Sequence, residues 1–298
     1  ERKADGTLAF PEPVQIENIN GDEKAPINIV WCGDWGNFGN YFVMHEPVVS
    51  SADSVHLFWS RPWPVEGESG TPMYAATYDR ETGKVSKPVY LGSNGHQIDG
   101  HNRPAAAIDN KGFLHVVLGG HATIQHPHEQ LKYVRSLKPN DTSAGFAEPV
   151  ELPVPERGEI LGDPGGTGYP SMVCGDEGVL HVVGRQYDVE AFVAPNIYTS
   201  PEGLLLTHSR LAYYRKEPGK EWEYRYLVLN YHPEYSLWFH KISKDRKNRL
   251  FLHYMHTCHA FERVIRHGPN LMISDDSGQS WRLCTSPGLG AKPESASK

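Results

Sequence analysis

The chain has 298 residues and a mass of 33.4 kDa, with 22% charged residues, 39% hydrophobic residues and a formal net charge of −7. This composition is that of a globular protein with a buried core, and it excludes a disordered, collagen-like or coiled-coil chain. No stretch approaches the roughly 18 apolar residues of a membrane-spanning helix, and no basic run is longer than 244–247. We therefore expect neither a membrane nor a nucleic acid as a partner.

One pattern recurs along the chain: a short strand, a polar turn, an apolar β-branched strand and then a second pair of strands. The repeats begin near residues 45, 101, 169 and 237, and their first turns are 50–53, 109–112, 175–178 and 244–248. The second strand pairs are 73–78 with 88–91, 131–135 with 149–152, 211–215 with 225–229, and 271–274 with 281–283. Four strands per repeat are typical of a β-propeller. A β-sandwich with similar hairpins is the alternative.

We therefore predict an all-β protein, a β-propeller of four-stranded antiparallel blades. Four repeats are visible, and residues 1–298 are expected to form a single propeller domain whose ring need not be complete. Residues 274–281 read S-D-D-S-G-Q-S-W, which resembles the Asp-box (BNR) turn of sialidase-like propellers. That motif marks the hairpin of a blade and carries no chemistry itself.

Strand direction predicts which residues share one rim of the ring. In a meander blade, the start of the first strand, the end of the second and the start of the third emerge on the same side. These positions hold mostly His, Tyr and Arg, namely His45, Arg61, His101, His121, His128, Tyr169, Arg185, His208, His240, His256, Cys258 and His267. Four other histidines lie inside apolar strands and are expected to be core residues with satisfied hydrogen bonds: His56, His115, His181 and His253.

Two of these segments resemble a known enzyme family. The run 101–121, from His101 through His121, and the run from Tyr169 to Arg185 look like the BNR-type propeller ulvan lyases. The resemblance covers residues from about 40 to 285. It implies a propeller, commonly seven-bladed, that cleaves a sulfated rhamnose–uronic acid polysaccharide by β-elimination and leaves an unsaturated uronyl end.

The residue types suit that chemistry. Elimination from a 4-linked glucuronate or iduronate needs a neutralised carboxylate, a base for the C5 proton and an acid for the departing O4. His101 and Tyr169 are the expected base and acid, in either order, because both side chains can transfer protons. Arg185 and His121 are expected to neutralise and orient the carboxylate. Arg61 and Arg103 are weaker candidates for binding sulfate or carboxylate groups.

A second cluster points to zinc. His256 and Cys258 lie on the same side of an extended segment, because side chains of a strand alternate. His267 begins the next strand, and His208 begins the corresponding strand one blade earlier. Three His and one Cys would hold one structural zinc ion per chain with no open position, and the resembled family also carries a bound ion. His240 or His259 could replace one of these ligands, and no organic cofactor is expected.

Two other functions remain as alternatives. A sialidase-like glycoside hydrolase needs a carboxylate pair or a Tyr–Glu nucleophile, for which Asp163 and Asp188 are the nearest candidates. A non-catalytic carbohydrate-binding propeller would need the aromatic residues alone. We expect a monomer that acts on an anionic polysaccharide and is secreted or periplasmic, because a large polymer is met outside the cytoplasm.

Overall fold

The computed structural model describes residues 48–61, 64–121, 126, 128–154, 163–191, 204–229, 237–260 and 263–284. At strand residues 163–164, 187–191, 204–209, 229, 238–239, 257–260 and 263–268 it describes the backbone alone. Every regular element in these ranges is a β-strand, and the described residues contain no helix able to cross a bilayer. The prediction of an all-β chain is confirmed.

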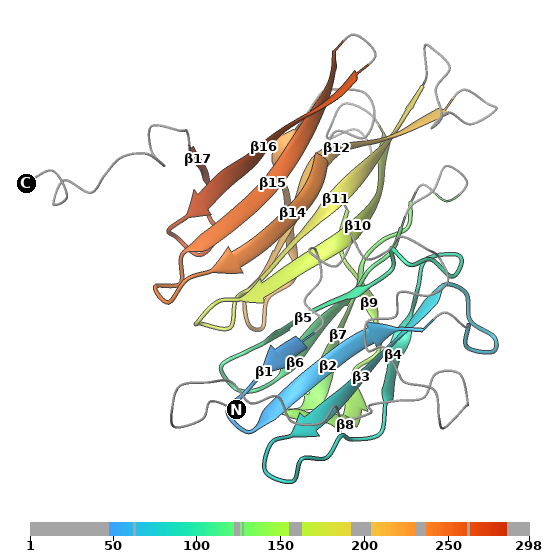
Figure 1. The fold of residues 1–298 in the computed structure, drawn as a ribbon, viewed down its shortest axis with the longest axis vertical. Coiled ribbons are helices and arrows are strands. Elements are labelled where there is room, and N and C mark those ends of the chain that lie inside the picture. The colour runs from blue at the N-terminus through green and yellow to red at the C-terminus, as the bar shows by residue number, and fades with distance from the viewer. Residues whose placement is uncertain are drawn as a thin grey trace, which may run out of the picture.

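Four antiparallel sheets follow one another in chain order (Figure 1), and we number them as blades one to four. Blade one contains β1 (Val48–Ser50), β2 (Ser54–Ser60), β3 (Thr71–Asp79) and β4 (Val89–Asn94). Blade two contains β5 (Pro104–Ile108), β6 (Leu114–Leu118), β7 (Lys132–Lys138), β8 (Asp141–Phe146) and β9 (Val150–Glu151). Blade three contains β10 (Asp163–Cys174), β11 (Leu180–Ala191), β12 (Leu204–Lys216) and β13 (Glu223–Leu229). Blade four contains β14 (Leu237–Lys244), β15 (Leu250–Ala260), β16 (Arg263–Ser274) and β17 (Arg282–Cys284).

Blade two departs from the predicted pattern at its outer strand. The sequence predicts one strand at 149–152, whereas the structure has two short strands, β8 and β9, that both pair with β7. Lys138 pairs with Asp141 at one end of β7, and Lys132 pairs with Glu151 at the other. Pro149 stands just before β9 and has no N–H to donate, which interrupts a continuous outer ladder.

In blades two and four the first hairpin closes through an aspartate side chain. In blade two, Oδ1 of Asp109 accepts hydrogen bonds from the backbone N–H groups of Lys111 and Phe113 at 2.9 and 2.8 Å. In blade four, Oδ1 of Asp245 accepts from Lys247 and Arg249 in the same way at 2.9 and 3.0 Å. Such Asx turns supply the hydrogen bonds that the strands cannot provide at the bend. The local sequence therefore sets where each first strand ends.

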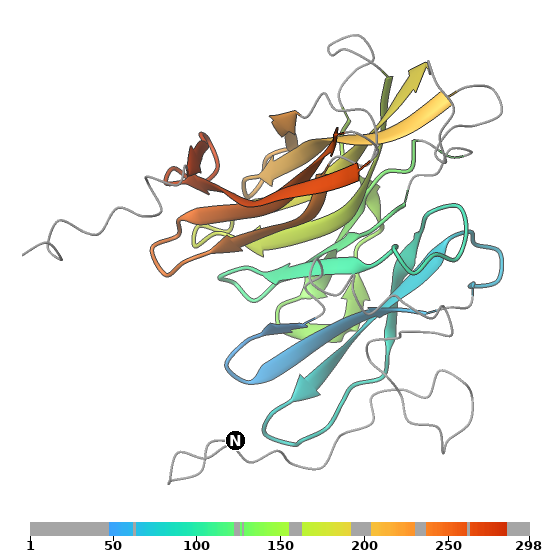
Figure 2. The ribbon, with the colours of Figure 1, turned by 45° about the horizontal axis from the view of Figure 1, so that its top comes forward.

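The hydrophobic core lies between neighbouring blades, as the stacked sheets of Figure 2 suggest. Phe58, Met73 and Leu91 of blade one pack on Leu114, Val116 and Leu118 of blade two. Between blades two and three, Leu131 and Val117 pack on Met172, Val182 and Tyr214. Between blades three and four, Val183, Leu211 and Tyr213 pack on Leu237, Ile242 and Leu252. The first strands β1, β5, β10 and β14 touch in sequence. This is propeller packing, so the predicted fold class is confirmed; one domain over 1–298 stays a prediction.

Three of the four strand histidines lie in these interfaces as expected. His56, His115 and His181 are buried, and Nδ1 of each is hydrogen-bonded to a hydroxyl, at 2.9 Å to Thr77 and at 2.7 Å to Tyr133 and Tyr213 respectively. The prediction is wrong for His253, which is exposed. His253 occupies the same place in blade four, and no further sheet among the described residues covers that face of the blade.

Candidate active site

Four predicted side chains from blades two and three come together at one rim. His101 precedes β5, His121 follows β6, and Tyr169 and Arg185 lie in β10 and β11. The ring centroids of His101 and His121 are 4.4 Å apart, and each lies 5.5 or 5.6 Å from that of Tyr169. The guanidinium carbon of Arg185 lies 3.8 Å from the centre of the Tyr169 ring. An imidazole pair, a phenol and a permanent cation therefore share one place.

Asp99 joins the two histidines, and sequence reasoning missed it. Its Oδ1 lies 2.5 Å from Nδ1 of His101 and accepts the His101 backbone N–H at 2.8 Å. Its Oδ2 lies 2.8 Å from Nδ1 of His121. Because a carboxylate only accepts, each imidazole donates its Nδ1 proton and keeps a lone pair on Nε2 when neutral. The signal was an acidic residue two positions before a rim histidine.

The charges in this cluster are set by burial and by these bonds. Burial favours the neutral acid at Asp99, but the hydrogen bonds from His101 and His121 outweigh it and hold the pKa of Asp99 far below its usual range. Burial lowers the pKa of His121 below 6.5, although Asp99 opposes that shift. At neutral pH the cluster therefore holds a carboxylate and a neutral His121 imidazole, which is the form of a general base.

The backbone at Tyr169 is strained in a way that aims its side chain. Tyr169 has a φ of 55°, and the pairing of β10 with β11 shifts register between Gly168 and Ser171. A bulge of this kind redirects a side chain at the rim of a sheet, and strained φ values cluster at functional sites. The Tyr169 hydroxyl lies 3.4 Å from Nε2 of His121, and its carbonyl accepts a 2.6 Å hydrogen bond from Nε2 of His240.

His240 supports Tyr169 from beneath. It is fully buried, and burial lowers its pKa to about 3, so it stays neutral and donates to the Tyr169 carbonyl. The sequence offered His240 as a replacement zinc ligand. The structure instead places it under the candidate active site.

Arg185 lies behind the tyrosine ring and not at the surface. The residue is fully buried, and its Nη1 donates to the Leu237 carbonyl at 3.3 Å. The expected contact of Arg185 with a substrate carboxylate is therefore not displayed in this arrangement, and it stays a prediction. The geometry shows a fixed positive charge against the face of the Tyr169 ring, which attracts negative charge on the phenol.

The two weaker arginine candidates lie beside the same loop. Nε of Arg103 donates to the Gly100 carbonyl at 2.7 Å, and 9% of Arg103 is exposed. Arg61 follows Ser60, whose hydroxyl donates to the Asn102 carbonyl at 2.8 Å, and stacks 3.7 Å from the centre of the Tyr74 ring. Both arginines thus stand near the His101 loop.

The predicted zinc ligands are only partly described. Side chains of His208, Cys258 and His267 lie outside the described residues, as do those of Asp163 and Asp188. The backbone register places His256 directly opposite His267, and Cys258 follows His256 by two residues on β15. That placement suits a shared ion, and Nδ1 of His256 lies 3.0 Å from the Asn270 amide nitrogen. Structural zinc stays a prediction.

Comparison with known proteins points to one enzyme family. No family model matches the chain. Over 123 residues the chain is 36% identical to an ulvan lyase from Nonlabens ulvanivorans, a match that covers 38% of this chain and 24% of that protein. The match thus spans about a quarter of the length of the curated relative.

One solved structure shows a similar fold. A structure described as a new family of polysaccharide lyase, PL25 ulvan lyase, aligns with a TM-score of 0.54 and 16% identity over 82% of this chain and 56% of that chain. The polysaccharide lyase Uly1 aligns with a TM-score of 0.49 and 13% identity over 80% of this chain and 54% of that chain. The chain is therefore similar in sequence to one ulvan lyase and in fold to another, which confirms the resemblance that its motifs indicated.

Proposed function

We propose that this chain is part of a polysaccharide lyase that cleaves ulvan or a similar sulfated uronic acid polysaccharide by β-elimination. The observation that carries the proposal is the cluster of Asp99, His101 and His121 beside Tyr169. Both histidines are hydrogen-bonded to Asp99. The His101 ring packs against the Tyr169 ring, and Nε2 of His121 lies 3.4 Å from the Tyr169 hydroxyl. The similarity in sequence to an ulvan lyase supports the choice of substrate class.

In the proposed reaction a base removes the proton on C5 of a 4-linked uronate. The electron pair of that C–H bond forms the C4–C5 double bond, the C4–O4 bond breaks, and O4 leaves with its electron pair and takes a proton from the acid. His101 and Tyr169 are the proposed proton carriers, and which one acts as base is left open. General acid–base catalysis of this kind contributes about 10²–10⁴-fold in rate.

The remaining groups prepare these two residues for proton transfer. Asp99 orients the imidazoles, because each Nδ1 proton is committed to one of its oxygens. Arg185 stabilises the negative charge that develops on Tyr169 when the phenol gives up its proton, through the face of the ring. His121 is neutral at neutral pH with its proton on Nδ1, so its Nε2 can accept a hydrogen bond from the Tyr169 hydroxyl, which lies 3.4 Å away.

The described geometry favours elimination over hydrolysis. A glycoside hydrolase of the usual kind places two carboxyl groups across the bond that it cleaves. The carboxylate found in this cluster, Asp99, is engaged by both histidines at 2.5 and 2.8 Å and is held in its charged form. It therefore suits an orienting group and not a proton donor.

Incubation of the purified chain with ulvan tests the proposal. We expect new ultraviolet absorbance from unsaturated uronyl ends and matching masses of unsaturated oligosaccharides. Saturated reducing ends alone would show hydrolysis, and binding without any new ends would show a carbohydrate-binding protein. Because such a polymer is met outside the cytoplasm, a secreted or periplasmic location belongs to the same proposal.

A further inference from the structure

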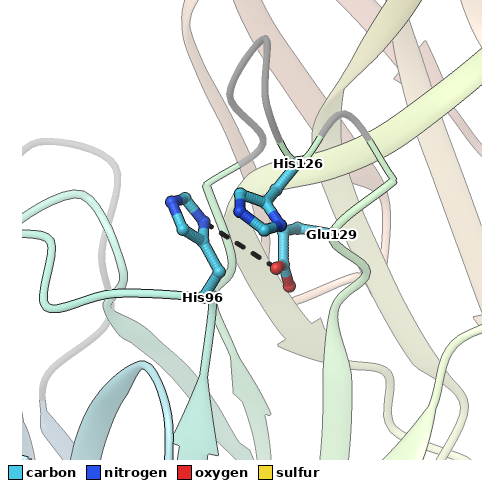
Figure 3. A group of neighbouring side chains, drawn as sticks. All are labelled: His96, His126 and Glu129. Carbon is cyan, nitrogen blue, oxygen red and sulfur yellow. Dashed lines mark ion pairs between the residues drawn. The ribbon is translucent and has the colours of Figure 1, made fainter.

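A second cluster of titratable side chains lies beside the candidate active site and takes no part in the reaction proposed above. His96 lies in the loop between β4 and β5, His126 and Glu129 lie in the connection between β6 and β7, and the three side chains point toward one another (Figure 3). The two imidazole rings stack with centroids 3.9 Å apart, and Nδ1 of His96 lies 3.8 Å from Oε1 of Glu129. One donor atom of each residue lies within 4.8 Å of the other two.

The scaffold under this cluster is well held. The side-chain amide of Asn94, at the end of β4, donates to the carbonyls of Leu118 and Gln130 at 2.9 and 2.8 Å. These bonds fix the segment before His96 against both ends of the β6–β7 connection, which carries the other two residues. The Glu129 carbonyl also accepts the Thr167 N–H at 3.1 Å.

Gly166 shows how closely β10 approaches Glu129. A Cβ atom on Gly166 would come within 1.9 Å of the Glu129 carbonyl oxygen, so only glycine fits at that position. The cluster is therefore built against the same strand that carries Tyr169.

The chemistry of the donor atoms suits a metal ion better than a salt bridge. The 3.8 Å separation of His96 and Glu129 is too long for a hydrogen bond, and Nδ1 of His96 is buried without a hydrogen-bond partner. Burial, reinforced by His126, lowers the pKa of His96, so that its ring is neutral at neutral pH. A neutral imidazole with a buried unpaired nitrogen next to a carboxylate is a ready ligand.

We propose that His96, His126 and Glu129 bind one divalent transition-metal ion of the zinc class. Two nitrogens and one carboxylate oxygen match the ligands that zinc takes at about 2.0–2.2 Å, and a tetrahedral site needs the donor atoms to close to about 3.3 Å from one another. His126 is exposed and the side chains of His96 and Glu129 are 20% and 22% exposed. The ion would therefore be reached from solvent and would keep an open coordination position.

This site differs from the predicted structural zinc in both place and chemistry. It contains no thiolate, and its residues lie in the loop that joins blades one and two and in the β6–β7 connection of blade two, whereas His256 and Cys258 belong to blade four. His96 precedes His101 by five residues, and the charge of Asp99 acts on His96. An ion at this position would bind a sulfate or carboxylate group of the polymer beside the reacting sugar; this consequence rests on the proposed function.

Cobalt and zinc binding to the full chain test the site. The metal-free chain is titrated with Co²⁺, and each variant is then analysed for bound Zn²⁺ after dialysis. His126→Ala removes an exposed ligand, and Glu129→Gln keeps the shape of the side chain while removing its charge. His128→Ala is the matched control, because His128 is an exposed histidine of the same segment outside the cluster.

We expect visible Co²⁺ bands that are lost in both ligand variants, and loss of one equivalent of Zn²⁺ in those variants but not in His128→Ala. Any near-ultraviolet band of a cobalt thiolate, which Cys258 of the predicted structural site would give, should be unchanged in all of them. The affinity for Zn²⁺ should fall at least as much as on loss of an outer-shell partner, about 10–100-fold. Circular dichroism checks that each variant is folded. Equal Zn²⁺ stoichiometry and affinity in all four proteins would overturn the inference.

Metal binding is measured without polysaccharide, so its result is separate from the test of function. A chain that cleaves ulvan but binds no ion through these residues contradicts the metal site alone. A chain that binds the ion but leaves ulvan intact supports the metal site and contradicts the lyase proposal.

Discussion

The chain contains two kinds of tyrosine–histidine pair. One kind joins neighbouring strands of the same blade. In blade three, Nδ1 of His181 lies 2.7 Å from the Tyr213 hydroxyl, and in blade two, Nδ1 of His115 lies at the same distance from the Tyr133 hydroxyl. At the rim, His121 meets Tyr169 through the other nitrogen, Nε2, at 3.4 Å, because Nδ1 is committed to Asp99.

The difference lies in the third group and in what surrounds the pair. His181 is fully buried and its Nδ1 lies against a neutral hydroxyl, so its proton has nowhere to go. The rim histidine is tied to a carboxylate and keeps Nε2 beside a phenol that lies against a cation. The same two residue types thus join neighbouring strands within a blade in one region and are arranged for proton transfer in the other.

The largest expected effect comes from Tyr169→Phe. It should reduce turnover of ulvan by about 10³-fold or more, within the range for loss of a general acid or base, while binding of the polysaccharide is retained. Tyr213→Phe is the matched control, since it removes the same hydroxyl from a pair within blade three and should leave turnover unchanged. Full activity of Tyr169→Phe would make the assignment wrong.

Asp99→Asn should have the next largest effect. We expect turnover to fall by about 10²-fold, at the lower end of the range for proton-transfer groups, because Asp99 orients the histidines and does not itself move a proton. Removing the carboxylate also lowers the pKa of His121, so the acid limb of the kcat/KM profile should move to lower pH. An unchanged profile would show that His121 does not titrate in the reaction.

Acid should destabilise the folded protein through its buried strand histidines. Burial lowers the pKa of His56 to about 4 and that of His181 to about 3. Below pH 6.5 the unfolded chain binds a proton at each of these residues while the folded chain does not, so stability is lost as the pH falls from 6.5 toward those values.

The slope is about 1.4 kcal/mol per pH unit for each such histidine. Denaturant unfolding measured between pH 7 and pH 4 gives this slope, and His181→Gln should reduce it by up to one histidine's share. A slope that is the same in the variant would contradict the burial of a neutral imidazole at this place.

Tyr213→Phe should weaken the fold without touching the site. It leaves Nδ1 of His181 buried without its partner, which costs about 1–3 kcal/mol. Thermal and denaturant unfolding measure the loss. If stability is unchanged, the 2.7 Å contact between β11 and β12 contributes nothing to the stability of blade three.

Arg61→Ala should give the smallest change. If Arg61 binds an anionic group of the substrate, an exposed ion pair of this kind contributes up to about 1 kcal/mol, so KM should rise by no more than about 5-fold. Loss of the stacking of Arg61 on Tyr74 should lower stability by about 0.5–1 kcal/mol. Arg80→Ala, at the opposite end of β3, is the control. A fall in kcat for Arg61→Ala would instead place this residue in the reaction.

Much of the fold could be predicted because it depends on local sequence. The period-two pattern of each strand and the turn residues between strands define the hairpins, and repetition of the unit defines the blades. The outer strand of blade two does not follow the pattern, and Pro149 explains why its ladder is interrupted. That both β8 and β9 pair with β7 could not be predicted, because it depends on the tertiary packing at that edge of the sheet.

The candidate site could be predicted in part. Strand direction alone indicates that His101, His121, Tyr169 and Arg185 lie on one rim. It cannot show that Asp99 bridges two histidines, that Arg185 is buried behind the phenol, or that His96 meets Glu129. Each of these depends on distances between loops from different blades.

By itself, the sequence determined the strands, the hairpins, the order of the blades and the residue types that stand at each strand end, because all of these are properties of short segments. Tertiary structure decided which of those residues meet and which are shielded from water. His181 and His253 occupy equivalent places in their blades, yet one is buried and the other is exposed. The reason is physical: burial and the energies that follow from it depend on what packs against a residue, and in a propeller that neighbour comes from the next blade.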